Sequence, residues 1–381
     1  MKILYCAIDQ TVPGTTGGPV HVRAVAEGLA ALGHDVTVLV SPGGEFPTGP
    51  VRWVPMAPPL GAKQLRWMRA GAVRRVAEIL RPDVVIERYY NFGGEGVSAA
   101  RAVNATAVLE VNAPVVDHPG SLKALLDRAL VVQPMRRWRE RVCARADVIV
   151  TPSAAILPPG TPPEKIVELE WGADTDRFRP DAAGALPFTR PFGTLAVFAG
   201  AFRSWHGAVH LVRAMRQLHE RRVGGLSAVL IGDGPELSNA RAEAAGLDTV
   251  IFTGAVEHDR MPVCLAAADI GVAPFDLDAH RPLSLGFFWS PLKIFEYMAV
   301  GLPVVAPAVG RIASLVQHER EGVLYDPSYP EGLGNALACL KDPALRAKLG
   351  ASARERAVRE YSWKAHCEKL SAVMVKLKTK N

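Results

Sequence analysis

The chain has 381 residues, of which 49% are hydrophobic and 22% are charged, and its net charge is +6. This length provides for two or three soluble domains, and a small excess charge that both halves share excludes the concentrated basic surface of a nucleic-acid-binding protein. The sequence contains no run of 18 apolar residues, so it predicts no membrane-spanning helix.

The cysteines and the first residues indicate a cytoplasmic protein. Five cysteines are scattered along the chain without the spacing of metal ligands, so we expect reduced core thiols. The first apolar run, residues 1–8, is too short for a signal peptide.

Short apolar strands alternate with amphipathic helices along nearly the whole chain. In the first half we predict helices near 18–32, 62–80 and 122–145, and strands near 2–8, 35–40, 51–55, 83–89, 105–112, 147–152 and 165–170. A proline-rich linker at 177–193 interrupts the pattern, which resumes with strands near 195–201, 227–232, 250–254, 270–274, 303–306 and 322–325. The alternation predicts two doubly wound α/β domains with parallel sheets, whose ligands lie beyond the carboxyl ends of the strands, in a cleft between the domains.

Polar residues follow several predicted strands of the first half. Gly17 and Gly18 precede the first helix, where they serve a tight turn or the close approach of a ligand. Tyr89 and Glu110 lie at strand ends, and Glu110 suits either a ligand-facing position or a structural ion pair. His118 follows in a loop.

Basic and aromatic residues interleave in two stretches of the first half, 63–75 and 135–141. Basic amphipathic helices lie on anionic membranes, so peripheral contact with the inner membrane face is one interpretation. A solvated helix face with ordinary core aromatics is the other, and the sequence favours it.

The segment Ser290–Pro303 carries the most specific chemistry. Ser290 suits the N-cap and Pro291 the first position of a helix, so the amides from Leu292 onward should be free to bind an anion. Lys293 and Glu296 share one face of this helix, where a cation suits a diphosphate and a carboxylate suits vicinal hydroxyls. The segment therefore predicts a nucleoside-diphosphate site, although many capped helices bind nothing.

This segment resembles the donor-binding motif of the retaining glycosyltransferase family 4 (glycosyl transferases group 1), which has the two-domain GT-B fold. The resemblance covers nearly the whole chain. It implies an acceptor-side domain at 1–180, a donor domain at 194–360 and a C-terminal helix, 361–381, that crosses back to the first domain. It also implies that Glu296 binds the ribose and that catalysis needs no metal, so the two Asp-x-Asp strings, at 174–176 and 276–278, are not metal sites.

Further motifs extend the resemblance. Phe198–Gly207 resembles the loop whose arginine and lysine clamp the diphosphate, which assigns His206 to the lysine position and leaves Arg203 as the nearest cation. Phe252–Val256 resembles the segment that receives the base through its backbone, with Gly254 and Val256 as the contacts. Gly17 and Gly18 match the first glycine-rich loop, and Asn112 stands where the family has a histidine beside the donor sugar.

Four positions depart from the family. Phe288 stands where the family has the first glutamate of its E-x7-E motif, and Asn112 stands where it has the sugar-contacting histidine. Ala201 and His206 stand where it has the loop arginine and lysine. The resemblance implies a metal-independent transferase that moves a sugar from a nucleotide sugar, UDP being favoured, to a hydroxyl of a glycan, lipid or small natural product. Lys293, Arg203 and Asn112 would be its catalytic residues and Glu110, Tyr89 and His118 its acceptor contacts. The departures leave two alternatives open, a binding protein that no longer transfers and a nucleotide-sugar epimerase.

Overall fold

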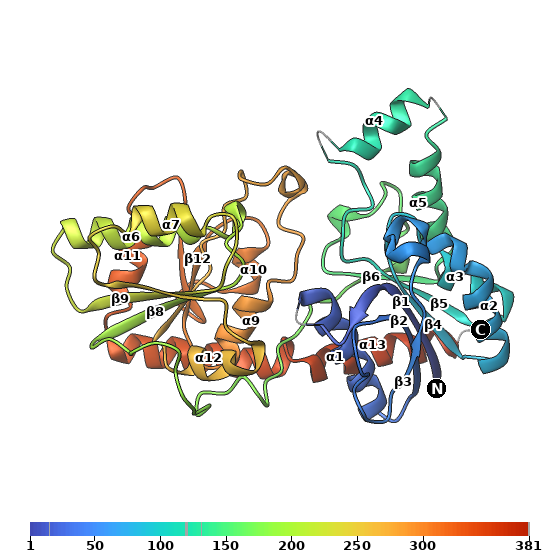
Figure 1. Ribbon diagram of the computed structural model, residues 1–381, viewed down its shortest axis with the longest axis horizontal. Helices are drawn as coiled ribbons and strands as arrows, with labels where there is room; N and C mark the ends of the chain where they lie inside the picture. Colours follow the sequence, from blue (N-terminus) through green and yellow to red (C-terminus); the bar gives the residue numbers. More distant parts are fainter. Residues whose placement is uncertain (15, 119–120, 131, 380–381) are drawn as a thin grey trace. The chain divides into compact units, whose positions relative to one another are not determined.

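The computed structural model describes residues 1–14, 16–118, 121–130 and 132–379. The chain divides into two compact units (Figure 1). Unit 1 comprises Met1–Trp171, Phe288–Ser290 and the chain from Trp363 onward, and unit 2 comprises Gly172–Phe287 and Pro291–Ser362. Thr15, which belongs to the predicted glycine-rich loop, lies outside the described residues.

Unit 1 is built on a seven-stranded parallel sheet in the order β3-β2-β1-β4-β5-β6-β7. Its strands are β1 (Lys2–Val12), β2 (Asp35–Pro42), β3 (Arg52–Pro55), β4 (Val84–Arg88), β5 (Thr106–Glu110), β6 (Val148–Thr151) and β7 (Ile166–Glu168). Its helices are α1 (Gly17–Ala31), α2 (Ala70–Leu80), α3 (Glu95–Ala102), α4 (Leu122–Ala129), α5 (Pro134–Arg145) and α13 (Trp363–Lys378). The central strands are buried from end to end, as expected for a parallel sheet that helices cover on both faces.

Unit 2 is built on a six-stranded parallel sheet in the order β10-β9-β8-β11-β12-β13. Its strands are β8 (Thr194–Ala199), β9 (Leu226–Ile231), β10 (Val250–Gly254), β11 (Ile270–Val272), β12 (Val304–Pro307) and β13 (Gly322–Tyr325). Its helices are α6 (Ala208–Glu220), α7 (Leu237–Glu243), α8 (Met261–Ala266), α9 (Leu292–Ala299), α10 (Ile312–Leu315), α11 (Gly332–Cys339) and α12 (Pro343–Glu360). The two predicted parallel sheets are thus confirmed.

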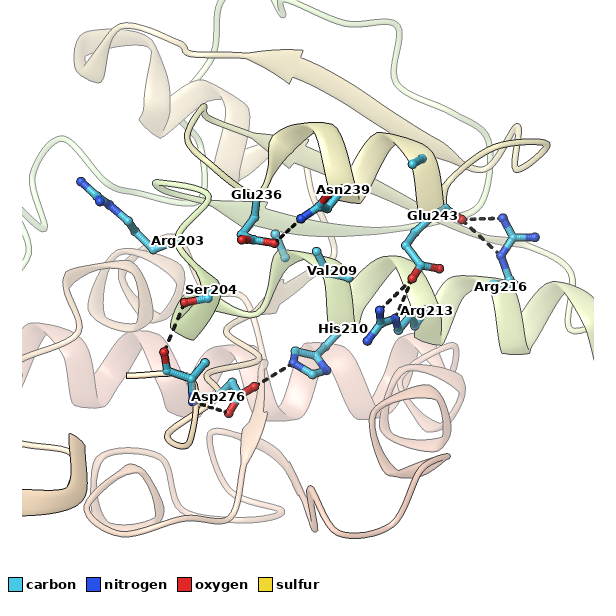
Figure 2. A pocket seen from close by; sticks show the side chains of 13 residues that line it. Arg203, Ser204, Val209, His210, Arg213, Arg216, Glu236, Asn239, Glu243 and Asp276 are labelled. Carbon is cyan, nitrogen blue, oxygen red and sulfur yellow. Dashed lines mark hydrogen bonds and ion pairs between the residues drawn. The ribbon is translucent and has the colours of Figure 1, made fainter. Parts of the chain in front are cut away.

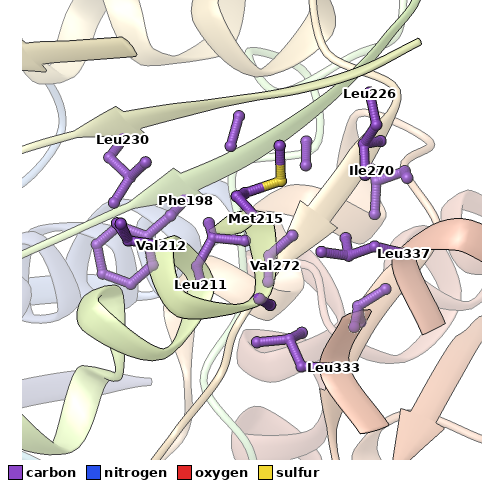
Figure 3. Packing of buried hydrophobic residues seen from close by; sticks show 14 of the residues in the cluster. Phe198, Leu211, Val212, Met215, Leu226, Leu230, Ile270, Val272, Leu333 and Leu337 are labelled. Carbon is purple, nitrogen blue, oxygen red and sulfur yellow. The ribbon is translucent and has the colours of Figure 1, made fainter. Parts of the chain in front are cut away.

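The core of unit 2 lies between its sheet and two helices (Figure 3). Leu211 and Met215 of α6 and Leu337 of α11 pack against Phe198 and Val272 of the sheet. These helical side chains recur every three or four residues, so each helix turns one apolar face to the strands. The packed core holds the strand ends and the loops beyond them in place.

Two predicted helices differ from those observed. The segment 62–80 begins as a 3-10 helix, Lys63–Arg69, before α2 starts at Ala70. The segment 122–145 is two helices, because Gln133 has a left-handed backbone (φ 48°) and Pro134 takes the first position of α5. A proline has no N–H to continue a helix but suits its first turn, so it starts a new helix here.

Both basic stretches of the first half contain a buried arginine. Arg66 is 0% exposed and its guanidinium contacts the carboxylates of Asp9 (2.6 Å) and Glu95 (2.6 Å). Arg139 is 2% exposed and donates to Asp117 (2.8 and 3.0 Å). These two side chains serve the interior of unit 1 and do not contribute to its surface.

The last helix, α13, packs within unit 1. Cys367, Leu370 and Met374 belong to the core of this unit, and Lys378 Nζ lies 2.6 Å from a carboxylate oxygen of Asp83. Among the described residues, no helix is both long and apolar enough to cross a lipid bilayer.

Candidate functional site

At the carboxyl ends of three neighbouring strands in unit 2, glycine residues form backbone hydrogen bonds between the strands. Gly200 follows β8, Gly232 follows β9, and Gly254 ends β10. The Gly200 N–H donates to the Ile231 carbonyl (3.0 Å), and the Gly232 N–H donates to the Gly254 carbonyl (2.8 Å). A Cβ on Gly232 would lie 2.0 Å from the Gly200 carbonyl oxygen, and its φ is 132°, so only glycine fits there. A ligand at this edge would therefore meet backbone atoms rather than side chains. Val256, two residues after Gly254, is half-buried.

Helix α9 supplies the amino end of the predicted diphosphate site. It begins at Leu292 with Pro291 as N-cap, so the prediction that Ser290 caps it is wrong. The Ser290 hydroxyl instead donates to Glu170 (2.7 Å) and accepts from the Trp171 N–H (3.0 Å). Within the described part of the chain, the backbone N–H groups of Leu292 and Lys293 have no hydrogen-bond acceptor. The amides that bind anions at a helix start are therefore available.

Lys293 has a buried ammonium group beside two aromatic rings. Its Nζ is shielded from solvent and has no hydrogen-bond partner among the described residues. It lies 4.3 Å from the ring centre of Phe198 and 5.2 Å from that of Phe275. Burial lowers the pKa of Lys293 to about 7, against the opposing effect of Glu296. Buried polar groups in native proteins nearly always have partners, so this one calls for an anionic ligand.

Glu296 lies one turn beyond Lys293 on the same face of α9. Burial raises its pKa to about 8, although the positive charges of Lys293 and Arg177 act in the opposite direction. Its carboxyl group has no hydrogen bond or ion pair with any residue that the structure describes. A carboxyl group in this state can bond to vicinal hydroxyls of a ligand.

The loop after β8 brings His206 close to Lys293. A Cβ on Gly200 would contact Lys293 Nζ at 3.1 Å and His206 Nδ1 at 3.7 Å, so the two side chains flank this glycine. His206 Nδ1 lies 2.6 Å from the Ala201 carbonyl oxygen, which makes it the protonated nitrogen of a neutral ring. Burial, with Lys293 nearby, lowers the pKa of His206 to about 3. His206 is therefore neutral near pH 7 and does not supply the positive charge of a lysine.

Arg203 lies in the same loop and is exposed, with its guanidinium 5.8 Å from the ring centre of Trp205. It borders a pocket of about 740 Å³ between α6 and α7 (Figure 2). Four of the other charged groups there form pairs: His210 with Asp276 (3.2 Å) and Arg213 with Glu243 (2.8 Å). Because neither Lys293 nor Glu296 lines the pocket, it is not the predicted donor site.

Unit 1 places Glu110 in a buried ion-pair network. The residue is 5% exposed. Arg88 donates to it at 2.9 Å, His21 Nε2 lies at 3.2 Å, and the Tyr5 hydroxyl and the Asn112 amide also donate to it. Of the two roles that its sequence position suited, the structure therefore shows the structural ion pair.

Asn112 and Ser290 come together through Trp171, all within unit 1. The Trp171 indole donates to Asn112 Oδ1 (2.8 Å), and its backbone N–H donates to the Ser290 hydroxyl. The Asn112 amide thus already bonds on both sides, since its nitrogen donates to Glu110. One N–H of Asn112 and one lone pair of its oxygen remain for a ligand.

The remaining predicted residues of unit 1 are Tyr89, His118, Gly17 and Gly18. Tyr89 is 6% exposed, and its hydroxyl donates to Asn91 (3.2 Å). His118 is half-buried, and its carbonyl accepts from Ser121. Gly17 begins α1, and the Gln10 side chain occupies the space where a side chain on Gly18 would lie.

Phe288 and the two Asp-x-Asp strings have structural surroundings. Phe288 is 1% exposed and packs against Trp289, so it offers no polar group to a sugar. Asp174 and Asp276 each accept hydrogen bonds from N–H groups two and three residues further on. Both Asp-x-Asp strings therefore stabilise turns.

Sequence reasoning missed the residues that hold α9. The buried Tyr297 hydroxyl accepts from the Ala199 N–H (2.8 Å) at the end of β8, and a Cβ on Gly271 would lie 2.5 Å from the Tyr297 ring. Phe198 and Phe275 surround the ammonium of Lys293. Their only sequence signal was a tyrosine and two phenylalanines near the predicted strands, which apolar packing explains equally well.

Two family models match the chain. The model for Glycosyltransferase Family 4 matches residues 15–177, and the model for Glycosyl transferases group 1 matches residues 193–342. The chain is 31% identical over 218 residues to the GDP-mannose-dependent alpha-(1-6)-phosphatidylinositol monomannoside mannosyltransferase of Mycobacterium tuberculosis, covering 55% of this chain and 56% of that one. It thus spans about half the length of that relative.

Other similarities extend over the whole chain. The D-inositol 3-phosphate glycosyltransferase of Acidothermus cellulolyticus is 27% identical, over 92% of this chain and 83% of that one. Two solved structures share the fold: sucrose-phosphate synthase of Thermosynechococcus elongatus (TM-score 0.73, 21% identity, 100% of both chains) and Anabaena HepE in complex with UDP and glucose (TM-score 0.68, 18% identity, 98% and 99%). The predicted GT-B fold is therefore confirmed.

Proposed function

The chain belongs to the group 1, family 4 glycosyltransferases, and from this premise we propose that it transfers a sugar from a nucleoside-diphosphate sugar to an acceptor hydroxyl. The observation that carries the proposal is the buried ammonium of Lys293, which has no hydrogen bond among the described residues and lies beside the free amides of α9. A diphosphate supplies the oxygens that both lack.

In the proposed reaction, the bond between the anomeric carbon and the diphosphate breaks, and the acceptor oxygen bonds to that carbon. The amides of Leu292 and Lys293 and the Lys293 ammonium stabilise the negative charge on the departing diphosphate. Arg203 reaches the outer phosphate from its exposed loop, and Glu296 binds the ribose hydroxyls. The acceptor proton passes to the departing phosphate. A bond to the donor sugar is the role we propose for the remaining N–H of Asn112.

The transfer test uses UDP-, GDP-, ADP- and TDP-sugars with a panel of acceptors. UDP remains the predicted nucleotide of the donor. GDP-sugars are included in the test because the name of the mycobacterial relative specifies GDP-mannose. Inositol phosphate and phosphatidylinositol monomannoside enter as acceptors because the relatives' names contain them. Formation of a glycosylated product with release of nucleoside diphosphate supports the proposal. Nucleotide and a new free sugar without any acceptor would indicate an epimerase instead.

The stereochemistry of the transfer and its independence of metal are tested separately. We propose retention, so NMR of the product should show the anomeric configuration of the donor. We also propose that no metal takes part, so EDTA should leave the rate unchanged. An inverted product, or a rate that a divalent cation restores after EDTA, would contradict these two points while leaving transfer itself intact.

A binding protein without transfer is the second candidate. It gains support from Phe288, which is buried and apolar, and from Asn112, which already bonds on both sides within unit 1. This candidate predicts nucleotide binding that depends on Lys293 together with no turnover on any acceptor. A single positive transfer reaction excludes it.

A further inference from the structure

Asn112 is the half-buried end of a hydrogen-bond network in unit 1. It lies two residues after β5, at the carboxyl end of a parallel strand, which is where ligands of such sheets bind. Glu110, the last residue of β5, is buried, and so are its partners Tyr5, His21 and Arg88. Asn112 therefore extends this buried network to a position that a ligand can reach.

The two neighbours of the Asn112 amide determine which way it points. The Trp171 indole has an N–H and no acceptor, so the atom 2.8 Å from it must be the Asn112 oxygen. Glu110 meets the other side as a carboxylate, which accepts but does not donate, so the atom beside it must be the Asn112 nitrogen. An amide turned by half a rotation would place oxygen against oxygen and nitrogen against an N–H. Trp171 and Glu110 together therefore allow one orientation.

Glu110 is itself held in place by three other side chains. Arg88 donates to one of its oxygens (2.9 Å), and the Tyr5 hydroxyl donates to the other. Burial, with Arg88 nearby, lowers the pKa of His21 well below its usual value, so this ring is neutral. Arg88 can only donate and lies 3.3 Å from His21 Nδ1, which leaves the ring proton on Nε2, 3.2 Å from Glu110. The carboxylate that orients Asn112 is thus fixed by buried donors.

Trp171 is fixed at both its backbone and its ring. Its backbone N–H donates to the Ser290 hydroxyl (3.0 Å), and its ring centre lies 4.4 Å from that of His21 and 5.6 Å from the guanidinium of Arg88. A phenylalanine at this position would keep the ring contacts and lose the indole N–H. The bond to Asn112 is therefore the feature that a tryptophan supplies here.

We propose that Trp171 is a positioning residue, which through its indole N–H orients the Asn112 amide to bind a hydroxyl of the donor sugar. This role rests on the proposed function, which gives that bond to Asn112. An oriented amide with one N–H and one lone pair left suits a hydroxyl, because a hydroxyl can both accept and donate. Orientation before binding avoids the entropy loss of a freely turning amide, so Trp171 strengthens sugar binding without touching the sugar.

The test compares the affinity for a nucleotide sugar with the affinity for its nucleoside diphosphate. Calorimetry without acceptor uses UDP-glucose with UDP and GDP-mannose with GDP, so the comparison isolates the sugar whether or not transfer can follow. Asn112→Ala should weaken binding of the nucleotide sugar about three- to tenfold and leave binding of the diphosphate unchanged. Trp171→Phe should weaken nucleotide-sugar binding about threefold. It should have no further effect in the Asn112→Ala background, because the bond that it removes is then already absent.

Trp363→Phe is the matched control, since the Trp363 ring packs against the same His21 (5.3 Å between ring centres) and, among the described residues, the tryptophan that bonds to Asn112 is Trp171. It should bind both ligands like the wild type. NMR gives a readout without ligand: the side-chain amide signal of Asn112, identified by its loss in Asn112→Ala, should exchange faster with water in Trp171→Phe than in Trp363→Phe.

Nucleotide-sugar affinity that Trp171→Phe leaves unchanged would overturn this role of Trp171 while the diphosphate site stands. So would a loss of affinity that persists in the Asn112→Ala background, since Trp171 would then act through the fold and not through Asn112. A wild-type chain that binds neither UDP nor GDP would instead contradict the proposed function, and the role of Trp171 with it.

Discussion

At the scale of single residues, Lys293 holds an ammonium group whose charge depends on a ligand. Its pKa is lowered to about 7 because it is buried and has no hydrogen bond to any described residue. A diphosphate beside Nζ favours the charged form and raises this pKa again. Above pH 7, binding must therefore take up a proton.

Nucleoside diphosphate affinity should fall as the pH rises. From about pH 7 to about pH 9 we expect a loss of about tenfold or more, because an increasing share of the free protein has neutral Lys293. The measurement is calorimetry in two buffers of different ionisation enthalpy. It is made in the Glu296→Gln variant, because the pKa of Glu296 is raised to about 8 and its titration overlaps with that of Lys293. Affinity that does not change with pH, with no proton uptake, would contradict this role of Lys293.

The same residue should destabilise the empty protein. Lys293→Met keeps the apolar contacts with Phe198 and Phe275 and removes the buried charge, so the free energy of unfolding should rise by about 1–3 kcal/mol. Because the pKa in the folded state is lowered from 10.5 to about 7, the gain should be full below pH 7 and fade toward pH 10.5. Denaturant unfolding at several pH values measures it. A loss of stability at pH 7 would show that the ammonium stabilises the fold.

At the scale of elements, the Tyr297 hydroxyl joins α9 to the end of β8. Tyr297→Phe removes the acceptor of the buried Ala199 N–H, which should lower the free energy of unfolding by about 1–3 kcal/mol. It should also weaken nucleotide binding, because Lys293 and Glu296 are on the same helix. Tyr329→Phe is the matched control, since Tyr329 of the same unit is 56% exposed. Equal stability of the two variants would show that packing alone holds α9.

The elements also show what local sequence can and cannot predict. Every predicted strand is present, because continuous apolar runs such as Val84–Ile86 have one stable environment, the middle of a covered sheet. The helix predicted at 122–145 breaks at Pro134, a signal that the sequence contained. The burial of Arg66 was not predictable locally, because its partners Asp9 and Glu95 lie 57 and 29 residues away.

Local sequence also predicted part of the candidate site. The nucleotide helix was found from its glycine, proline and Lys/Glu pattern, but its start was misplaced because Ser290 bonds to Glu170 and Trp171, 120 and 119 residues away. Glu110 looked like a ligand contact because a strand-end carboxylate has few local partners. Its actual partners, Tyr5, His21 and Arg88, come from three other elements of unit 1.

At the scale of the whole molecule, the chain returns to unit 1 at its C-terminal end, where α13 completes the core. Met374→Ala should lower the free energy of unfolding by about 2–5 kcal/mol, because Met374 is 0% exposed and the substitution leaves a cavity. Val375→Ala on the same helix is the control, since Val375 is 46% exposed and should change stability by less than about 0.5 kcal/mol. Similar unfolding curves for the two variants would show that α13 does not stabilise unit 1.

The molecule as a whole is proposed to act through one nucleotide site, which a thermal-shift series with UDP, GDP, ADP and TDP tests most directly. One diphosphate should raise the unfolding temperature of the wild type and of Lys341→Met, which replaces an exposed lysine of the same unit, with or without EDTA. Lys293→Met and Glu296→Ala should abolish the shift. No shift with any of the four nucleotides at millimolar concentration, or an undiminished shift in Lys293→Met, would contradict the donor site proposed for α9.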